Sequence, residues 1–460
     1  MSMQVFNSLT RRVEPLEPLA DNTIRLYTCG PTVYNFAHIG NFRAYTFEDI
    51  LRRVVQFNGM KVKQVMNLTD VDDKTIRGAN AAGVALTDYT KTYKDAFFAD
   101  LKVLNVQPAE VYPAATDHIP EMIALVEKLV EKGVAYKSDD GSVYFAVTKF
   151  PGYGKLAHID FDHQRTGARC AADEYDKENV GDFALWKAWE ESDGPVGWDS
   201  PWGRGRPGWH IECSAMSMKY LGETFDLHTG GIDNLFPHHE NEIAQAEAAT
   251  GKEFVRTWMH CAHLRVNGEK MSKSLGNFFT LRDLLDKGWT GREIRYVLVN
   301  AHYRQGLNFA FSALEDARKS LERIDRCVDA LAARAKDEPA PAFAQEALDA
   351  FTAAVNDDLN TPKAFAALFE LVRQTNASDT CSKAVLDVFQ KMDAVLGVIF
   401  FGKAAKAEVP AEVQALLDAR AAARAAKNWA ESDRLRDAIA AAGWAVKDSK
   451  DGQTVTKKSI

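Results

Sequence analysis

The first hundred residues alternate between strand-like and helix-like patterns, and this alternation constrains the fold more than any other feature of the sequence. The apolar run at 24–29 ends at a Gly-Pro pair, as is typical of a short β-strand. Apolar side chains then recur at helical spacing over 41–58, before Gly59, and a β-rich run follows at 61–68. A strand, a helix and a second strand in this order predict a right-handed crossover within a parallel sheet.

The remainder of the chain divides into segments of different character. A second apolar and glycine-rich block at 207–264 has the same mixed pattern, so we expect the region at about 117–205 to be an insertion that splits one α/β domain. After about residue 310 only helical patterns remain, and six apolar residues over 314–331 repeat at alternating steps of three and four. The predicted fold is a split α/β domain with a parallel sheet, followed by an all-α helical bundle and a small C-terminal domain.

Composition and charge exclude several classes of protein. Hydrophobic residues make up 46% of the chain, which is enough for a large core, but no apolar run approaches the ~18 residues of a membrane span. Six cysteines are too sparse for a disulfide framework, so we expect free thiols or metal ligands in a reducing compartment, the cytoplasm. The net charge of −8 argues against a protein coated in phosphate-binding surface.

The C-terminal segment 403–460 is locally basic, because it contains 11 basic and 8 acidic residues. Arg420, Arg424 and Lys427 lie at positions i, i+4 and i+7, which predicts one basic stripe on a helix. Such a stripe is either a solvated helical face or a localised nucleic-acid contact. A second helix is predicted to end at Gly443.

Two short motifs have the chemistry of a polyphosphate site. His38, Gly40 and Asn41 lie between the first strand and its helix, where a parallel sheet places nucleotide phosphates near free helix N–H groups. Lys270 and Lys273 lie in the sequence KMSKS between two glycines, and two lysines on such a loop can stabilise charge that develops on a pyrophosphate. Either motif alone can arise by chance or as an exposed basic loop.

Four residues also form a possible metal site. His238 and Glu242 are four residues apart, so on a helix they share a face and can chelate one ion, although His239 could equally be the ligand. Cys29 ends the first strand and Cys213 lies in the other half of the split domain. Two thiolates, an imidazole and a carboxylate are an acceptable tetrahedral zinc set, whereas distant cysteines can also be buried packing residues.

Together the two phosphate motifs resemble the signature of class I aminoacyl-tRNA synthetases. Longer blocks resemble the bacterial type of cysteinyl-tRNA synthetase across essentially the whole chain. These blocks lie at 27–34, 67–74, 200–203, 205–216 and 236–245. The resemblance implies ATP-dependent ligation of L-cysteine to tRNA(Cys) through a cysteinyl-adenylate, with Mg²⁺ accompanying ATP and one Zn²⁺ per chain recognising the substrate thiolate.

The resemblance also assigns functions to individual residues. It implies that the zinc ligands are Cys29, Cys213, His238 and Glu242, and that the other four cysteines are packing residues. It implies that ATP contacts His38, Gly40, Asn41, Lys270, Lys273 and Asp233, that Lys273, Lys270 and His38 are catalytic, and that cysteine contacts Gly30, Thr69 and Trp209. It further implies that Arg420, Arg424 and Lys427 contact the tRNA anticodon.

The resemblance and the composition together give domain boundaries, and we expect a monomer. The predicted boundaries are 1–116 and 206–265 for a Rossmann-like catalytic domain, 117–205 for a connective insertion, 266–312 for the KMSKS loop and a stem-contact region, 313–402 for the helical bundle, and 403–460 for a C-terminal anticodon-binding domain.

Two positions depart from the family pattern, and two alternative functions remain open. The first motif commonly ends in histidine, where this chain has Asn41. Near the C-terminus an aromatic residue often follows Gly-Thr-Thr, whereas this chain has Gly452-Gln453-Thr454-Val455, which lacks it. One alternative is a ligase that joins cysteine to an amino-sugar inositol in mycothiol synthesis, which shares the zinc and nucleotide motifs. The other is a non-catalytic zinc-dependent RNA-binding paralogue. The basic tail favours tRNA over the amino-sugar, and the intact lysines of KMSKS favour catalysis.

Overall fold

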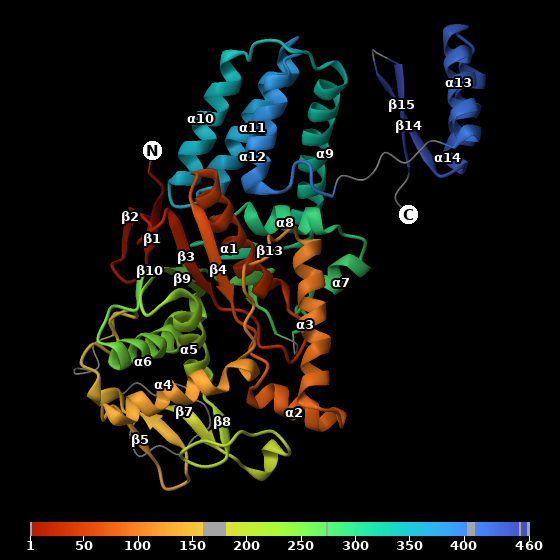
Figure 1. The fold of residues 1–460 in the computed structure, drawn as a ribbon. Helices are drawn as coiled ribbons and strands as arrows, with labels where there is room; N and C mark the ends of the chain where they lie inside the picture. The colour runs from red at the N-terminus through yellow and green to blue at the C-terminus, as the bar shows by residue number, and fades with distance from the viewer. Residues whose placement is uncertain (1, 160–180, 273–274, 403–409, 450–451, 458–460) are drawn as a thin grey trace. The chain divides into compact units, whose positions relative to one another are not determined.

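The computed structural model describes residues 2–159, 181–272, 275–402, 410–449 and 452–457 (Figure 1). The chain forms two compact units, Met1–Phe401 and Gly402–Ile460. No helix within the described residues is long and apolar enough to cross a membrane.

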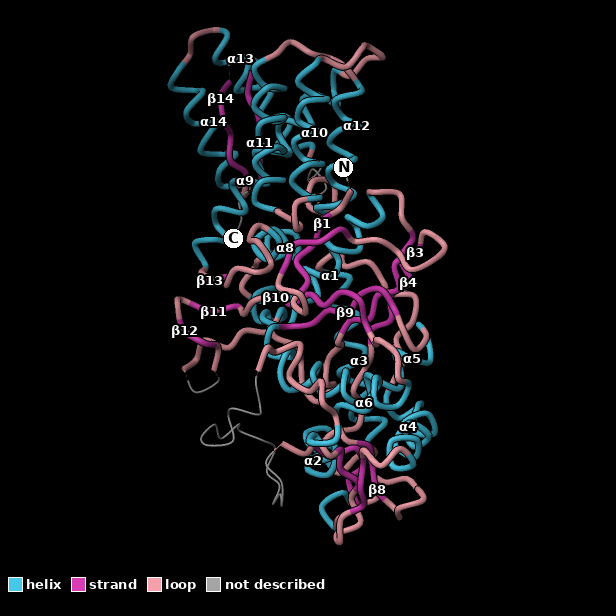
Figure 2. The backbone as a smooth tube through the Cα atoms, turned by 90° about the vertical axis from the view of Figure 1, so that its left-hand side faces the viewer, coloured by secondary structure: helices cyan, strands magenta, loops and turns pink. Residues whose placement is uncertain are grey.

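A four-stranded parallel sheet forms the centre of the first unit, and it confirms the predicted strand–helix–strand arrangement. Its strand order is β10-β9-β3-β4. The strands are β3 (Thr23–Thr28), β4 (Lys61–Met66), β9 (Phe225–Gly231) and β10 (Val255–Cys261), and the crossover helix is α1 (Ile39–Phe57). Gly59, with a φ of +78°, follows α1 as the sequence predicts. In Figure 2 the sheet lies between α1 on one face and α5 (Trp209–Leu221) on the other, so both of its faces are covered.

A separate antiparallel sheet lies between the two halves of the parallel sheet in the sequence, as expected for an insertion. Its order is β5-β6-β7-β8, and it lies with α4 at the lower end of Figure 1. The elements from β4 to β9 other than α5 are α2 (Asp73–Ala82), α3 (Leu86–Val103), α4 (Ile119–Glu131), β5 (Ala135–Lys137), β6 (Val143–Phe145), β7 (Phe183–Ala188) and β8 (Gly205–Pro207).

The helix α6 (Glu240–Thr250) lies between β9 and β10 in the sequence. Short elements then connect the parallel sheet to the helical bundle. They are β11 (Leu264–Val266), β12 (Glu269–Lys270), α7 (Leu281–Asp286), α8 (Gly291–Val299) and β13 (Leu307–Phe309). The strands β12, β11 and β13 form a three-stranded sheet, and β1 (Gln4–Asn7) pairs with β2 (Arg12–Pro15) at the start of the chain.

Four helices form the predicted bundle. They are α9 (Phe311–Arg334), α10 (Ala342–Asn356), α11 (Thr361–Ala377) and α12 (Lys383–Leu396). The apolar seam predicted for α9 is confirmed, because all six of its residues are buried. These residues are Leu314, Ala317, Leu321, Ile324, Val328 and Leu331. They belong to the same hydrophobic core as α1, so the bundle and the parallel sheet form one packed body.

The second unit is not purely helical, which corrects the prediction of a helical tail. Its helices α13 (Ala411–Ala425) and α14 (Trp429–Ala441) are followed by an antiparallel hairpin of β14 (Trp444–Ser449) and β15 (Gly452–Lys457). Trp444 and Val446 of the hairpin pack against Val413 and Leu417 of α13. The hairpin therefore supplies part of a small core that the two short helices cannot complete alone.

The junction between α1, α8 and the bundle contains a fully buried arginine. Arg295 donates to Asp49 Oδ2 at 2.6 Å and to the carbonyl oxygens of Leu396 and Leu104 at 2.9 Å each. Arg53 binds the same Asp49 oxygen at 2.8 Å. A buried charge is tolerated only when its partners are fully arranged in this way.

We expect Arg295→Ala to lower the free energy of unfolding by about 3–5 kcal/mol, because it leaves buried polar groups at this junction without their donor. Urea unfolding followed by circular dichroism measures this loss. Arg373→Ala is the control, since Arg373 forms an exposed ion pair with Glu370, and it should leave the unfolding midpoint almost unchanged. Equal midpoints for the two variants would contradict this account of the junction.

Candidate active site

The carboxyl ends of β3 and β9 lie side by side and form the base of the site. The N–H of Cys29, directly after β3, donates to the carbonyl oxygen of Thr229 at 3.2 Å. Side chains that follow the two strands therefore meet at one edge of the sheet, where parallel α/β sheets bind their ligands.

Four side chains gather at this edge, and they are the four residues in which the sequence predicts a metal site. The ligand atoms of Cys29, Cys213, His238 and Glu242 all lie within 4.8 Å of one another. Cys213 comes from α5, while His238 belongs to a π-helical turn over Leu235–His239 that leads into α6. His238 Nε2 lies 3.1 Å from Glu242 Oε1, so these two side chains share a face as their spacing predicts.

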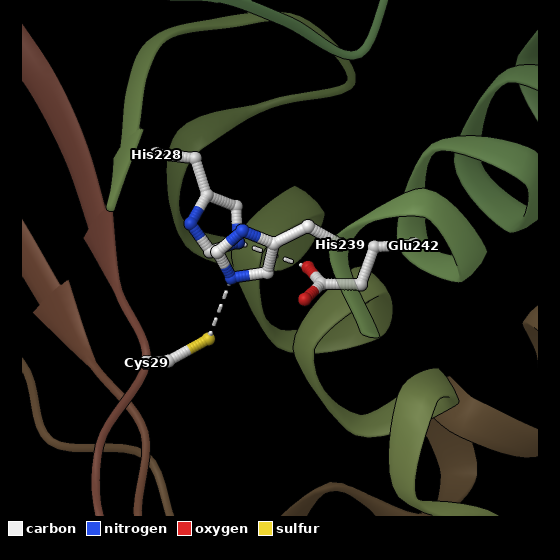
Figure 3. Close-up of side chains that lie close together, drawn as sticks. All are labelled: Cys29, His228, His239 and Glu242. Carbon is white, nitrogen blue, oxygen red and sulfur yellow. Dashed lines mark hydrogen bonds and ion pairs between the residues drawn. The ribbon is translucent and has the colours of Figure 1, made fainter. Parts of the chain in front are cut away.

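A second set of four overlaps the first and shares Cys29 and Glu242. Figure 3 shows it: His228 Nε2 lies 3.0 Å from Glu242 Oε2, and His239 Nε2 lies 3.3 Å from Cys29 Sγ. The structure thus places His238 in one set of four and His239 in the other, and both sets include Cys29 and Glu242. The sequence analysis missed His228, which is buried within β9.

Further histidines extend this cluster inward. His239 Nδ1 lies 2.9 Å from His260 Nε2, and His260 Nδ1 lies 2.8 Å from Ser8 Oγ. His210 Nδ1 lies 2.8 Å from His238 Nδ1. Only the tertiary fold brings these residues together, so no local spacing could have indicated the chain of contacts. Each contact fixes the orientation of a ring that lies next to a candidate ligand.

Burial governs the protonation of the cluster. It raises the pKa of Glu242 to about 8, against the opposing effect of His238. The pKa of Cys29 is raised well above its usual value, first by a hydrogen bond with Cys213 and then by burial. Burial also lowers the pKa of His238. A bound cation would reverse these shifts for the carboxyl and thiol groups, because it favours their ionised forms.

The three predicted cysteine contacts surround this cluster. The N–H of Gly30 donates to Asn67 Oδ1 at 2.9 Å, and the hydroxyl of Thr69 donates to Glu212 Oε2 at 2.7 Å. The indole ring of Trp209 stacks on the imidazole of His238, with 4.2 Å between ring centroids and 24° between planes. The indole is also partly exposed, so it forms a wall between the cluster and solvent.

The first phosphate motif forms the N-terminal cap of α1. His38 Nδ1 accepts from the N–H of Asn41 at 3.2 Å, and Asn41 Oδ1 accepts from the N–H of His38 at 3.1 Å. This reciprocal pair is a capping box built from residue types other than the usual serine and glutamate. Burial lowers the pKa of His38, while the negative charge of Asp233 opposes that effect, so Asp233 lies close to this cap.

The second phosphate motif lies against the first. A Cβ atom added to Gly40 would lie 2.6 Å from Met271 Cε, and the N–H of Ile39 donates to the carbonyl oxygen of Phe279 at 3.0 Å. Lys270 is exposed at the end of β12, and Lys273 lies outside the described residues. The structure thus brings together two motifs that are about 230 residues apart in the sequence.

The predicted basic stripe on the tail is wrong in two respects. Arg420 is 1% exposed and donates to Asp448 Oδ1 at 2.8 Å and to Gln453 at 2.7 Å, so it joins α13 to the hairpin. Lys427 follows the end of α13 with a φ of +58° and therefore leaves the helical face. Arg424 lies on α13 and is partly exposed, but it also pairs with Asp448 Oδ2 at 3.1 Å, so its predicted contact with nucleic acid stays a prediction.

The remaining cysteines differ in their surroundings. Cys261 and Cys327 are buried, as expected of packing residues, while Cys381 is partly exposed. Cys170 lies outside the described residues.

Comparison with known proteins identifies the family. Residues 15–319 match the family described as tRNA synthetases class I (C) catalytic domain, 350–401 match the DALR domain, and 406–455 match the cysteinyl-tRNA ligase anticodon binding domain. The chain belongs to the cysteine–tRNA ligases. It is 51% identical to the cysteine–tRNA ligase of Protochlamydia amoebophila over 99% of this chain and 98% of that protein, and 47% identical to that of Chlamydia muridarum over 99% and 100%.

Solved structures confirm the class I fold at much lower sequence identity. Mycobacterium tuberculosis methionyl-tRNA synthetase in complex with methionyl-adenylate superimposes with a TM-score of 0.58 at 15% identity, covering 82% of this chain and 89% of that one. The Agrobacterium radiobacter K84 agnB2 LeuRS ternary complex gives a TM-score of 0.60 at 11% identity, covering 84% and 85%. Because relatives that are 47–51% identical over almost the whole chain are cysteine–tRNA ligases, this ligase joins L-cysteine to tRNA at the expense of ATP. This assignment replaces both alternatives, the amino-sugar ligase and the non-catalytic paralogue.

We expect Gly30→Ala to abolish most cysteine activation, because its Cβ would lie 1.7 Å from the carbonyl oxygen of Asn67. The loop would have to move by about 1 Å or more, and displacements of that size in an active site cost on the order of 10²-fold in rate. Cysteine-dependent ATP–pyrophosphate exchange measures the loss.

Gly152→Ala is the matched control, since the Cβ there meets Phe150 at an ordinary 3.5 Å. Full exchange activity in the Gly30→Ala variant would show that the close approach to Asn67 is not required.

Proposed function

We propose that Cys29, Cys213, His238 and Glu242 hold one zinc ion in this ligase. Their ligand atoms lie close enough together, and two thiolates, an imidazole and a carboxylate are typical zinc ligands. Glu242 Oε1 is buried and has no hydrogen-bond partner among the described residues, although His238 Nε2 lies only 3.1 Å away. A buried carboxylate oxygen without a hydrogen bond, 3.1 Å from an imidazole nitrogen, is a favourable arrangement for a shared cation. This pairing favours His238 over His239 as the imidazole ligand.

The pocket around this ion would select cysteine. When bound, zinc supplies a thiophilic Lewis acid that favours a thiolate over a hydroxyl group. Shape alone cannot separate cysteine from serine by the orders of magnitude that translation requires. Gly30 lets the chain after Cys29 pass close to the carbonyl oxygen of Asn67, because it has no side chain. Thr69 would offer a hydroxyl oxygen, and Trp209 would shield His238 from water. His228 and His239 orient Glu242 and Cys29 through their contacts.

We further propose that ATP lies along the N-terminus of α1. His38, Gly40 and Asn41 would contact its phosphates, Asp233 would approach the ribose, and Mg²⁺ would accompany the nucleotide. A helix N-terminus offers free N–H groups and a favourable dipole for anions. Met271 lies against this cap, which supports a contact of its neighbour Lys270 with the phosphates. We extend the proposal to Lys273 because it belongs to the same motif.

The reaction would then follow two steps. A carboxylate oxygen of cysteine bonds to the α-phosphorus of ATP while the bond from that phosphorus to the β-phosphate oxygen breaks, which gives cysteinyl-adenylate and pyrophosphate. A hydroxyl of the 3′-terminal ribose of tRNA(Cys) next attacks the cysteinyl carbonyl, and AMP leaves. Lys273, Lys270 and His38 would stabilise the charge that accumulates during the first step, because preorganised donors act most strongly there.

The second unit would contact the anticodon, and Arg424 is our candidate there. Arg420 supports the fold of this unit. A contact between Lys427 and the anticodon remains a prediction. The predicted domain boundaries, the monomeric state and the cytoplasmic location likewise remain predictions. Cysteine-dependent ATP–pyrophosphate exchange, followed by transfer of cysteine to tRNA(Cys), tests the proposed two-step reaction.

We expect Cys213→Ser to lower the zinc content of the protein and to raise the KM for cysteine by about tenfold or more. The reason is that an alkyl hydroxyl is a much poorer zinc ligand than a thiolate. Elemental analysis measures the metal, and exchange kinetics measure KM. Cys327→Ser is the control, because Cys327 is buried in the helical bundle and should affect neither quantity.

The same preparations test specificity directly. Serine should compete poorly with cysteine in the zinc-loaded protein and better after the metal is removed. If the metal-free protein still prefers cysteine by the full margin, then zinc has only a structural function and this proposal is wrong.

We expect Lys270→Ala and Lys273→Ala each to slow cysteine-dependent exchange by on the order of 10²-fold, with a much smaller effect on ATP affinity. The contact would strengthen mainly in the transition state, so kcat should fall more than the KM for ATP rises. Lys319→Ala, on the exposed face of α9, is the control. A rise in KM for ATP without a fall in kcat would contradict the proposed function of the two lysines.

A further inference from the structure

Two aromatic side chains are exposed on the loop that leads into α1. Tyr34 is 38% exposed and Phe36 is 37% exposed, and they lie only a few residues before His38. The same loop begins at Gly30, so it runs from the proposed cysteine pocket to the proposed phosphate site. Exposed rings at such a position cost free energy unless they have a partner.

A cation lies against each of these two rings. Lys74 Nζ, from α2, is 5.3 Å from the centroid of Tyr34, and Arg282 Cζ, from α7, is 4.9 Å from the centroid of Phe36. Arg282 also pairs with Asp100 at 3.2 Å. Lys74 forms no ion pair with the described residues and is exposed. Each of the two exposed rings of this loop is therefore paired with a cation.

Other aromatic residues hold this arrangement in place. The hydroxyl of Tyr89 donates to the carbonyl oxygen of Tyr34 at 2.9 Å, and Tyr93 contacts Phe36 edge-on with 5.3 Å between ring centroids. Tyr89 and Tyr93 contact each other at 5.2 Å. Gly78 is required for this packing, because a Cβ there would lie 2.3 Å from the Tyr89 hydroxyl oxygen. The exposed rings are thus preorganised rather than loosely attached.

This combination matches the chemistry of single-stranded nucleic acid. Proteins bind such strands with aromatic faces on which bases stack and with cations that contact the phosphates. The chain carries a net charge of −8, so local cations are needed wherever a polyanion approaches. Every tRNA ends in a single strand, and its terminal ribose must reach the cysteinyl carbonyl beside this loop.

We propose that Tyr34, Phe36, Lys74 and Arg282 form a rim that binds the single-stranded 3′ end of the substrate tRNA. The inference rests on the proposed location of cysteine and ATP between Gly30 and His38. The two rings would stack on bases of the strand, and the two cations would neutralise the adjacent phosphates. The rim would thereby guide the terminal hydroxyl toward the adenylate without taking part in its formation.

The test separates the two steps of the reaction. Tyr34→Leu and Phe36→Leu keep apolar bulk but remove the ring face, and each should lower kcat/KM for tRNA in aminoacylation by about 5- to 100-fold. Cysteine-dependent ATP–pyrophosphate exchange should change by less than about threefold. Tyr136→Leu and Phe400→Leu are the matched controls, since these rings are 37% and 38% exposed elsewhere in the molecule.

A shortened tRNA locates the effect. tRNA(Cys) without its unpaired 3′ nucleotides, used as a competitive inhibitor, should bind the wild-type protein and both ring variants equally well. Lys74→Gln and Arg282→Gln should each reduce the slope of log affinity for full-length tRNA against log salt by about 0.7.

Three results would overturn the proposal. One is an equal loss of affinity for the shortened tRNA, which would indicate a general change of structure. Another is a rise in the KM for ATP in the ring variants, which would indicate that the adenine of ATP, and not a tRNA base, binds to the rim. The third is unchanged aminoacylation in both variants. Failure of the proposed function is distinguishable from all three, because the wild-type protein would then show no cysteine-dependent exchange.

Discussion

The pairing of β3 with β9 in the parallel sheet positions every group of the active site. The strand order reverses at β3, because α1 leads to β4 on one side while β9 lies on the other. A crevice forms at such a point, outside the carboxyl ends of the strands. The N–H of Cys29 donates to Thr229 across this boundary, so the loop after β3 and the turn after β9 start at fixed relative positions. Groups that are two hundred residues apart in the sequence can therefore form one cluster.

Buried polar groups beneath this boundary make the site dependent on the whole domain. Glu48 on α1 accepts from the hydroxyl of Thr229 at 3.0 Å, while burial raises its pKa to about 8. His260 and His239 continue the polar layer from β10 to Cys29. Each of these groups would be costly to bury alone, and each has a hydrogen-bonding neighbour, although Glu48 Oε2 is buried without a partner among the described residues. Displacement of one element of the sheet would thus leave several polar groups unsatisfied at once.

Periodic and locally capped elements could be predicted from the sequence, whereas contacts between distant elements could not. The seam of α9 was predictable because apolar residues repeat at helical spacing along a long helix. The basic residues of the tail repeat in the same way, but Arg420 is neutralised by Asp448 from a hairpin whose strands give only a weak alternating pattern. Residue chemistry alone could propose the metal site, but it left His238 and His239 as alternatives, and only the resemblance to a known family selected His238. His228 was missed because a buried histidine within a strand has no local signal.

The hydrogen bonds of Asn41 explain how the active site accommodates an amide where the family commonly has histidine. Its Oδ1 accepts from the N–H of His38, so the side chain closes the cap of α1 through its oxygen alone. An amide group carries its two donor hydrogens on Nδ2, and these are not used by the cap. In the proposed complex this nitrogen can donate to a phosphate, as an imidazole would. Met271 Cε lies where a side chain at Gly40 would begin, so in that complex the phosphates would approach the helix end beside Asn41 and His38. One residue would then stabilise the helix terminus and still contribute a donor to the nucleotide.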